Sequence, residues 1–251
     1  MMNTYNPFSI EGKTIFVTGA SSGIGKAIAI ECSKMGAKLV ITGRDSEKLN
    51  NTFKILEGED HKLIVADLLN DNDIEKLINE LPTLNGIVHC AGFTKPVPFQ
   101  FVNELDLTLI MKVNFFSPTL ITQRLLKSKK ISKGASIVFI SSISGVLCSY
   151  IAGGMYSASK GAINGLVKNL AIEFGTKNIR VNSVCPGMIN TEILSSGQVT
   201  KEQLEEDMKK YPLKRYGEPE EVAHAVIYLL SGASSWVTGT NIIIDGGYTA
   251  L

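Results

Sequence analysis

The sequence has few residues of the kinds that bind metals or form disulfides. Its cysteines are scattered along 251 residues without a CxxC pair, and each lies in or beside an apolar segment. That pattern favours buried free thiols over zinc ligands or disulfides, and free thiols indicate a reducing, cytoplasmic location. The three histidines stand apart from one another and predict no metal site. The cysteines are Cys32, Cys90, Cys148 and Cys185.

The sequence also lacks a charge excess and long apolar runs. Its 25 basic and 24 acidic residues leave a formal net charge of +1. That balance gives no global attraction to nucleic acid or to an anionic membrane, and we expect neither as a partner. No apolar run approaches the length that crosses a bilayer. Residues 1–11 contain no basic segment followed by an apolar one, so no signal peptide is predicted.

What the sequence does have is a regular alternation of β-rich runs and helix-prone segments. Such alternation predicts a Rossmann-like, doubly wound α/β fold, with about seven parallel strands and helices on both faces of the sheet. No linker or repeat divides the chain, so residues 1–251 are expected to form a single domain with a core from about residue 10. The expected strands cover residues 13–18, 38–42, 62–66, 86–90, 136–140, 179–185 and 241–244. The expected helices cover residues 24–35, 46–56, 71–79, 104–127, 155–174 and 218–230.

A glycine-rich turn joins the first expected strand to the first expected helix. It reads Gly19-Ala20-Ser21-Ser22-Gly23-Ile24-Gly25, with the spacing G-x-x-x-G-x-G in place of the commoner G-x-G-x-x-G. The glycines let backbone approach a ligand, and the helix N-terminus offers free N–H groups and the positive end of a dipole. The turn therefore predicts binding of a dinucleotide pyrophosphate; the alternative is a glycine-rich turn that binds no nucleotide.

The second strand is followed by an arginine at a position that selects between cofactors. An acidic residue about twenty residues past the glycines would bind the ribose of NAD, but Gly43 and Arg44 stand there. A guanidinium binds phosphate bidentately, which favours the 2′-phosphate of NADP. A solvated loop arginine is the alternative. Asp45 reads as the N-cap of the next helix.

Two further strand ends offer contacts for a nucleotide, because strand ends meet at the edge where doubly wound sheets bind ligands. Asp67 and Leu68 follow the third strand, where the acid could bind an adenine amino group or begin a turn. Ala91 and Gly92 follow the fourth strand and leave room for a flat ring.

The long expected helix at 104–127 contains a polar residue among apolar ones. Asn114 needs partners there, such as a water or a backbone carbonyl, because an unpaired buried amide costs stability. Pro118 is expected to perturb the helix just beyond it.

The helix expected at 155–174 begins with a tyrosine and a lysine four positions apart. Tyr156 and Lys160 then lie on the same face of the helix. An ammonium near a phenol lowers the pKa of the phenol from about 10, so that it can exchange a proton at neutral pH.

Residues 188–213 are polar and flanked by Pro186 and Pro212, and they are predicted to form a mobile flap over the substrate; the alternative is a surface helical hairpin.

Together these motifs resemble the short-chain dehydrogenase/reductase family in its short, single-domain branch. The resemblance covers residues 10–251: the glycine turn resembles the family's cofactor motif, and Tyr156-x-x-x-Lys160 its catalytic motif. Asp245-Gly246-Gly247 matches the family's tail. Cys90 is a departure, because the family usually has an asparagine there that helps to hold the sheet; we expect the change to affect local stability more than chemistry.

The resemblance implies a role for each candidate residue. Tyr156 protonates the developing alkoxide, Lys160 lowers the pKa of Tyr156 and binds the nicotinamide ribose, Ser142 orients the carbonyl, and Asn114 anchors a water. Ser141 and Ser144 are the alternatives to Ser142. The catalytic candidates are Asn114, Ser142, Tyr156 and Lys160. The cofactor-binding candidates are Gly19, Ser21, Ser22, Gly23, Ile24, Gly25, Arg44, Asp67, Leu68, Ala91, Gly92, Tyr156, Lys160, Pro186, Gly187, Ile189 and Thr191.

The resemblance implies an oxidoreductase that uses NADP(H), with NAD(H) as the alternative, to reduce a carbonyl to a secondary alcohol. It is similar to 3-oxoacyl-(acyl-carrier-protein) reductases, and the expected substrate is a small-molecule or carrier-bound carbonyl. The basic segment 127–133 could meet an acidic carrier, although such clusters are usually only solvated. The alternatives are a sugar, polyol or other secondary-alcohol dehydrogenase, and a non-catalytic NADP-binding regulator. The family further implies a homotetramer or homodimer.

Overall fold

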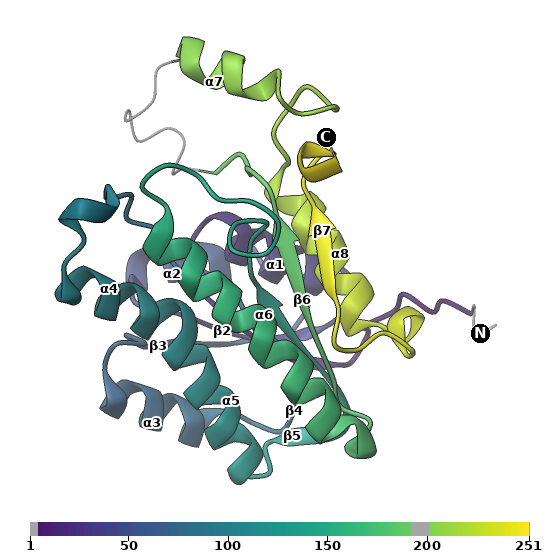
Figure 1. Cartoon of the computed structure of the whole chain (residues 1–251). Coiled ribbons are helices and arrows are strands. Elements are labelled where there is room, and N and C mark those ends of the chain that lie inside the picture. Colours follow the sequence, from purple (N-terminus) through teal and green to yellow (C-terminus); the bar gives the residue numbers. More distant parts are fainter. Residues whose placement is uncertain (1–4, 192–200, 251) are drawn as a thin grey trace.

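The computed structural model describes residues 5–191 and 201–250, which form one parallel sheet between two layers of helices (Figure 1). The strand order is β3-β2-β1-β4-β5-β6-β7, and every neighbouring pair is parallel. This order confirms the predicted doubly wound α/β fold. The strands are β1 (Thr14–Thr18), β2 (Lys38–Gly43), β3 (Lys62–Val65), β4 (Leu84–His89), β5 (Ile131–Ile140), β6 (Arg180–Pro186) and β7 (Asn241–Ile244). The α-helices are α1 (Gly23–Lys34), α2 (Ser46–Phe53), α3 (Asp71–Glu80), α4 (Glu104–Met111), α5 (Ser117–Lys127), α6 (Gly154–Phe174), α7 (Lys201–Met208) and α8 (Pro219–Leu230).

Each face of the sheet has its own apolar core, because the central strands are apolar on both sides. On one face, Ile28 of α1, Leu49 of α2 and Val226 of α8 pack against the strands. On the other face, side chains of α3, α5 and α6, such as Leu125 and Val167, do the same. Burial on both faces explains why these strands read as continuous apolar runs rather than as alternating patterns.

The strand that precedes the serine-rich segment is longer than predicted. β5 begins at Ile131 rather than at Ser136, and its register with β4 shifts between Leu84 and Gly86. Its first residues are exposed or only partly buried, so they lack the apolar run by which a buried strand is recognised.

The helix predicted at 104–127 is present, but a π-helical turn, η2 (Lys112–Phe116), divides it into α4 and α5. Pro118 lacks an N–H and cannot donate to the carbonyl four residues back. Within the turn, the Ser117 N–H bonds to the carbonyl of Lys112, five residues earlier. The perturbation predicted from Pro118 therefore falls on the turn that carries Asn114, and π-helical turns are frequent at functional sites.

The carboxyl ends of the strands meet at one edge of the sheet, and the neighbouring strands β1 and β4 mark the switch point of the strand order. Ligands of doubly wound sheets bind in this crevice.

Helix α7 stands apart from the sheet above this edge (Figure 1). The predicted flap at 188–213 lies partly outside the described residues, and its mobility stays a prediction. Within the described residues, no helix is long and apolar enough to span a bilayer.

Candidate active site

The tyrosine and lysine in the first turns of helix α6 lie next to each other at this edge. The ammonium nitrogen of Lys160 lies 5.6 Å from the centroid of the Tyr156 ring, as the i, i+4 spacing predicts. Lys160 is buried, and its Nζ donates a hydrogen bond of 2.8 Å to the carbonyl of Ile140, the last residue of β5. Burial lowers the pKa of Lys160 to about 8. The lysine is therefore held by the sheet and is close to its protonation equilibrium at neutral pH.

The pKa of Tyr156 moves in the direction opposite to the one predicted. Burial raises it to about 12, and the neighbouring Ser142 hydroxyl acts against that rise. The prediction considered only the ammonium of Lys160, whereas removal of the phenolate from water has the larger effect here. Tyr156 is therefore a protonated phenol at neutral pH, which is the form that can donate a proton.

Three serines compete for the position beside Tyr156, and their hydrogen bonds distinguish them. Ser142 is close enough to Tyr156 for its hydroxyl to lower the pKa of the phenol, and that hydroxyl also accepts the N–H of Ser144 at 3.1 Å. The Ser141 hydroxyl instead donates to the backbone carbonyl of Lys160 at 3.2 Å, and the Ser144 hydroxyl bonds to that of Ser157 at 2.8 Å. The geometry favours Ser142 as the residue that faces a substrate oxygen.

Asn114 binds the segment that follows β4 and the helix that carries Tyr156. Its Oδ1 accepts the N–H of Phe93 at 3.0 Å, and its Nδ2 donates to the Phe93 carbonyl at 2.9 Å and to the Ser159 hydroxyl at 3.0 Å. A Cβ on Gly92 would lie 3.2 Å from Oδ1 of Asn114 and 3.4 Å from Nζ of Lys160. The side chains of Asn114 and Lys160 therefore both approach the backbone at Gly92. A water or a backbone carbonyl was predicted as the partner of Asn114, and the carbonyl of Phe93 is that partner.

The glycine turn has no room for side chains, which fits a ligand held by backbone. A Cβ on Gly25 would lie 2.2 Å from the carbonyl oxygen of Gly19, and a Cβ on Gly19 would lie 2.8 Å from Cα of Ala91. Ser22 is the N-cap of α1, but its side chain accepts no N–H of the first turn. The free N–H groups at the start of this helix form the donor set that a pyrophosphate needs.

Thr18 holds the glycine turn against the end of β4, and the sequence analysis did not identify this role. Its hydroxyl accepts the N–H groups of Cys90 and Ala91, both at 3.1 Å. This contact joins two neighbouring strand ends at the position where the family asparagine is replaced by Cys90. The signal in the sequence was a hydroxyl residue directly before Gly19.

Arg44 follows β2, the neighbour of the strand that leads into the glycine turn, and Asp67 follows β3 on the far side of β2. Arg44 is exposed and follows Gly43, whose Cβ would lie 3.2 Å from the hydroxyl oxygen of Ser21. Asp67 accepts the N–H of Leu69 at 3.0 Å through its Oδ1, which is the turn that the sequence offered as one alternative. The neighbouring Leu68 is buried. The predicted contacts of these residues with a nucleotide stay predictions.

The segment that follows β6 crosses over the glycine turn. The Gly187 N–H bonds to the Ile244 carbonyl at 2.8 Å, and Ile189 is buried. The Thr191 methyl carbon would lie 3.4 Å from a Cβ on Gly23. Thr191 therefore lies beside the glycine turn, and the predicted contacts of Ile189 and Thr191 with a cofactor stay predictions.

Comparison with known proteins gives consistent results. The profile described as "Enoyl-(Acyl carrier protein) reductase" matches residues 19–249. A tropinone reductase homolog of Arabidopsis thaliana is 37% identical and covers 99% of this chain and 96% of its own. A 3-oxoacyl-(acyl-carrier-protein) reductase of Rickettsia prowazekii is 34% identical over 95% of this chain and 97% of its own.

Among solved structures, a short chain dehydrogenase/reductase family protein superposes with a TM-score of 0.86, at 30% identity over 97% of this chain and 100% of its own. A putative 2-deoxy-D-gluconate 3-dehydrogenase of Agrobacterium tumefaciens with bound NADP has a TM-score of 0.89, at 29% identity over 98% of this chain and 100% of its own.

Proposed function

Because the chain belongs to the short-chain dehydrogenase/reductase family, whose members are oxidoreductases that bind a nicotinamide cofactor, we propose that it reduces a carbonyl to a secondary alcohol with NADPH. The observation that carries the proposal is the cluster of Ser142, Tyr156 and Lys160: the ammonium nitrogen of Lys160 lies 5.6 Å from the centroid of the Tyr156 ring, and Ser142 is close enough to the phenol to oppose the rise in its pKa. Bound NADPH supplies the hydride, and the protein supplies position and protons.

The three side chains have separate tasks in this reaction. The Ser142 hydroxyl donates to the carbonyl oxygen and stabilises the charge that develops there. The Tyr156 phenol then gives its proton to the alkoxide, which requires the protonated form that burial maintains. The positive charge of Lys160 stabilises the phenolate that remains, and Asn114 fixes the backbone at Phe93 beside them. A water anchored by Asn114 would return a proton through Lys160.

NADPH is proposed over NADH because Arg44 occupies the end of β2 in place of a carboxylate. The solved relative with bound NADP supports the same choice. The glycine turn and the N-terminus of α1 would hold the pyrophosphate, and Ile189 and Thr191 the nicotinamide amide.

The substrate is proposed to be a 3-oxoacyl thioester or a similar ketone, because the chain is similar to the Rickettsia enzyme.

The basic segment 127–133 gives limited support for binding of an acidic carrier protein. Lys130 caps the end of α3, because its Nζ donates to the carbonyls of Ile78, Asn79 and Leu81 at 2.7, 2.8 and 2.6 Å. Lys127, Lys129 and Lys133 remain exposed. A sugar or polyol dehydrogenase is the second candidate, favoured by the similarity to the gluconate-type dehydrogenase.

One screen tests the proposal. NADPH and NADH are each mixed with an acetoacetyl thioester, cyclic ketones and keto-sugars, and cofactor oxidation is followed at 340 nm, the absorbance of the reduced nicotinamide. We expect turnover with NADPH and at least one ketone. Binding of NADPH without turnover across the panel would favour a non-catalytic regulator.

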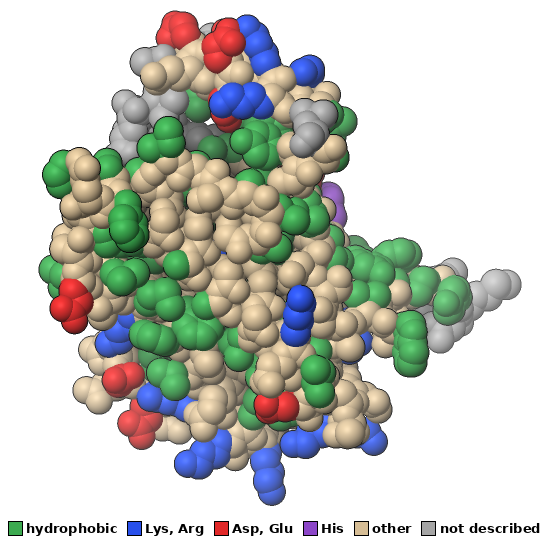
Figure 2. Space-filling model, in the orientation of Figure 1, with side chains coloured by type: hydrophobic (Ala, Val, Ile, Leu, Met, Phe, Trp, Pro, Cys, Tyr) green, Lys and Arg blue, Asp and Glu red, His purple; other side chains and the backbone are tan. Residues whose placement is uncertain are grey.

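A homotetramer or homodimer in the cytoplasm is part of the same proposal. Figure 2 shows hydrophobic side chains gathered on the side of the molecule where α4, α5 and α6 lie. The exposed fractions are 78% for Leu105, 45% for Phe116 and 80% for Ile172, which is more apolar exposure than packed helices of a monomer usually leave. Light scattering after gel filtration would measure the mass.

A further inference from the structure

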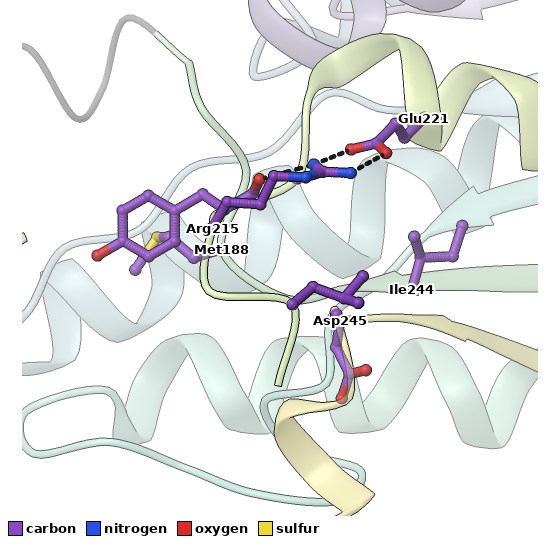
Figure 3. Close-up of a pocket in the computed structure, with 9 residues that line it drawn as sticks. Met188, Arg215, Glu221, Ile244 and Asp245 are labelled. Atoms are coloured by element: carbon purple, nitrogen blue, oxygen red, sulfur yellow. Dashed lines mark hydrogen bonds and ion pairs between the residues drawn. The ribbon is translucent and has the colours of Figure 1, made fainter. Parts of the chain in front are cut away.

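We propose that the ion pair between Arg215 and Glu221 positions residues 188–191, and that it thereby controls binding of the nicotinamide half of the cofactor. The proposal assigns a positioning role to two residues that contact neither the reacting atoms nor the pyrophosphate site, and it rests on the proposed use of NADPH. Figure 3 shows the pair at the wall of a pocket that is also lined by Met188, Ile244 and Asp245.

Residues 188–190 are held by a short ladder to Gly217. The Gly217 N–H bonds to the Met188 carbonyl at 3.1 Å, and the Asn190 N–H bonds to the Gly217 carbonyl at 2.7 Å. The two segments run parallel at the bridge between Ile189 and Gly217. A Cβ on Gly217 would lie 2.8 Å from Cδ1 of Ile189. The position of the turn at 215–218 therefore sets the position of Ile189.

The ion pair fixes that turn to the start of helix α8. The Arg215 guanidinium binds the Glu221 carboxylate through two parallel hydrogen bonds of 2.7 Å, and it also donates to the Tyr216 carbonyl at 3.0 Å (Figure 3). The same carboxylate accepts the Glu218 N–H at 2.8 Å as part of a capping box. One carboxylate thus orients both ends of the turn that carries Gly217.

The pair is maintained across the working range of pH. The Arg215 guanidinium, and then the backbone N–H of Glu218, lower the pKa of Glu221 to about 2. Bidentate pairing of this kind is specific in geometry, and it keeps a partly exposed arginine in one orientation. A surface ion pair without such geometry would have no effect on a segment on the far side of the turn.

A binding comparison tests the role. Adenosine 2′,5′-bisphosphate resembles the adenosine half of NADPH and would contact the glycine turn and Arg44 but not residues 188–191. We expect Arg215→Met and Glu221→Gln each to weaken NADPH binding by about fivefold and to leave binding of the bisphosphate unchanged. The double variant should lose no more than either single variant, because the pair acts as a unit. NADPH binding is measured by cofactor fluorescence and bisphosphate binding by calorimetry.

Two further variants separate positioning from folding. Gly217→Ala disturbs mainly the contact with Ile189, because the added Cβ would lie 2.8 Å from Cδ1 of Ile189 and at an ordinary contact distance of 3.6 Å from Oε2 of Glu221; it should give the same selective loss of NADPH affinity. Lys209→Met breaks the exposed pair of Lys209 with Glu206 and should bind both ligands as the wild type does. If the folded Arg215 and Glu221 variants lost affinity equally for both ligands, or kept the wild-type affinity for NADPH, the positioning role would be overturned. The proposed function would not be affected by that result. A wild-type protein that binds neither ligand would overturn the proposed function, and this inference with it.

Discussion

The side-chain amide of Asn114 donates a hydrogen bond of 3.0 Å to the hydroxyl of Ser159, the residue directly before Lys160. The π-helical turn between α4 and α5 is thereby joined to the helix that carries Tyr156. The same amide holds Phe93 through both its N–H and its carbonyl. Three segments far apart in the chain are thus held by one side chain beside the candidate site.

We expect Asn114→Leu to lower both stability and turnover. The leucine would leave the Phe93 N–H and carbonyl and the Ser159 hydroxyl without their amide partner in a buried site. Each unsatisfied buried group costs about 1–3 kcal/mol. Urea unfolding and the steady-state rate measure the two effects, with Asn79→Leu on the exposed end of α3 as the control. Unchanged stability would show that Asn114 does not join these segments.

Tyr156→Phe should keep NADPH binding and lose turnover by a factor of about 10²–10⁴, the usual contribution of a positioned general acid. The ring and its packing remain, and only the hydroxyl on which Ser142 acts is removed. Tyr150→Phe is the matched control, because its hydroxyl bonds to Thr94 at 2.9 Å on the surface nearby. A Tyr156→Phe enzyme that turns over at the wild-type rate would refute the assigned role.

Arg44→Asp should shift the cofactor preference from NADPH towards NADH. The substitution removes a phosphate-binding guanidinium and adds a carboxylate that can accept the ribose hydroxyl. We expect at least about a tenfold loss of NADPH affinity, in line with a lost charge-assisted bond. Lys54→Asp makes the same change of charge at an exposed position beyond helix α2 and should have little effect. Equal NADPH affinity in both variants would mean that Arg44 does not meet the phosphate.

His89 should make the protein less stable in mild acid. It is buried against Phe139, its Nε2 bonds to the Thr122 hydroxyl at 2.8 Å, and its Nδ1 has no partner among the described residues. Burial lowers its pKa to about 3. Its folded-state pKa lies below the unfolded value near 6.5, so the unfolded chain takes up the proton first. Stability is therefore retained above about pH 6.5 and lost as the pH falls, by about 2 kcal/mol at pH 5.

Urea unfolding at pH 7.5 and pH 5 measures this loss. His89→Leu should flatten the difference between the two pH values by about the same amount, whereas Asn79→Leu at an exposed position without a titratable side chain should not change it. An identical pH dependence in His89→Leu and the wild type would show that the buried imidazole is not the responsible group.

The features that depend on residues close together in the chain could be predicted from the sequence. Parallel strands buried on both faces leave apolar runs, and the glycine turn between β1 and α1 is a local pattern, so the fold followed from them. Tyr156 and Lys160 lie next to each other because positions four apart on a helix share a face, whatever the helix packs against.

Only the tertiary structure decided the features that depend on contacts between distant segments. The pKa of Tyr156 rises because burial outweighs the neighbouring ammonium, and burial is set by the packing of the whole domain. Ser142 is distinguished from Ser141 because it acts on the pKa of Tyr156, whereas the Ser141 hydroxyl donates to the backbone carbonyl of Lys160. Nothing in the sequence pairs Arg215 with Glu221. Only the folded chain shows their ion pair and the bridge between Gly217, in the turn between them, and Ile189. Spacing along a helix is fixed by its hydrogen bonds, whereas desolvation and long-range pairing exist only once the chain is folded.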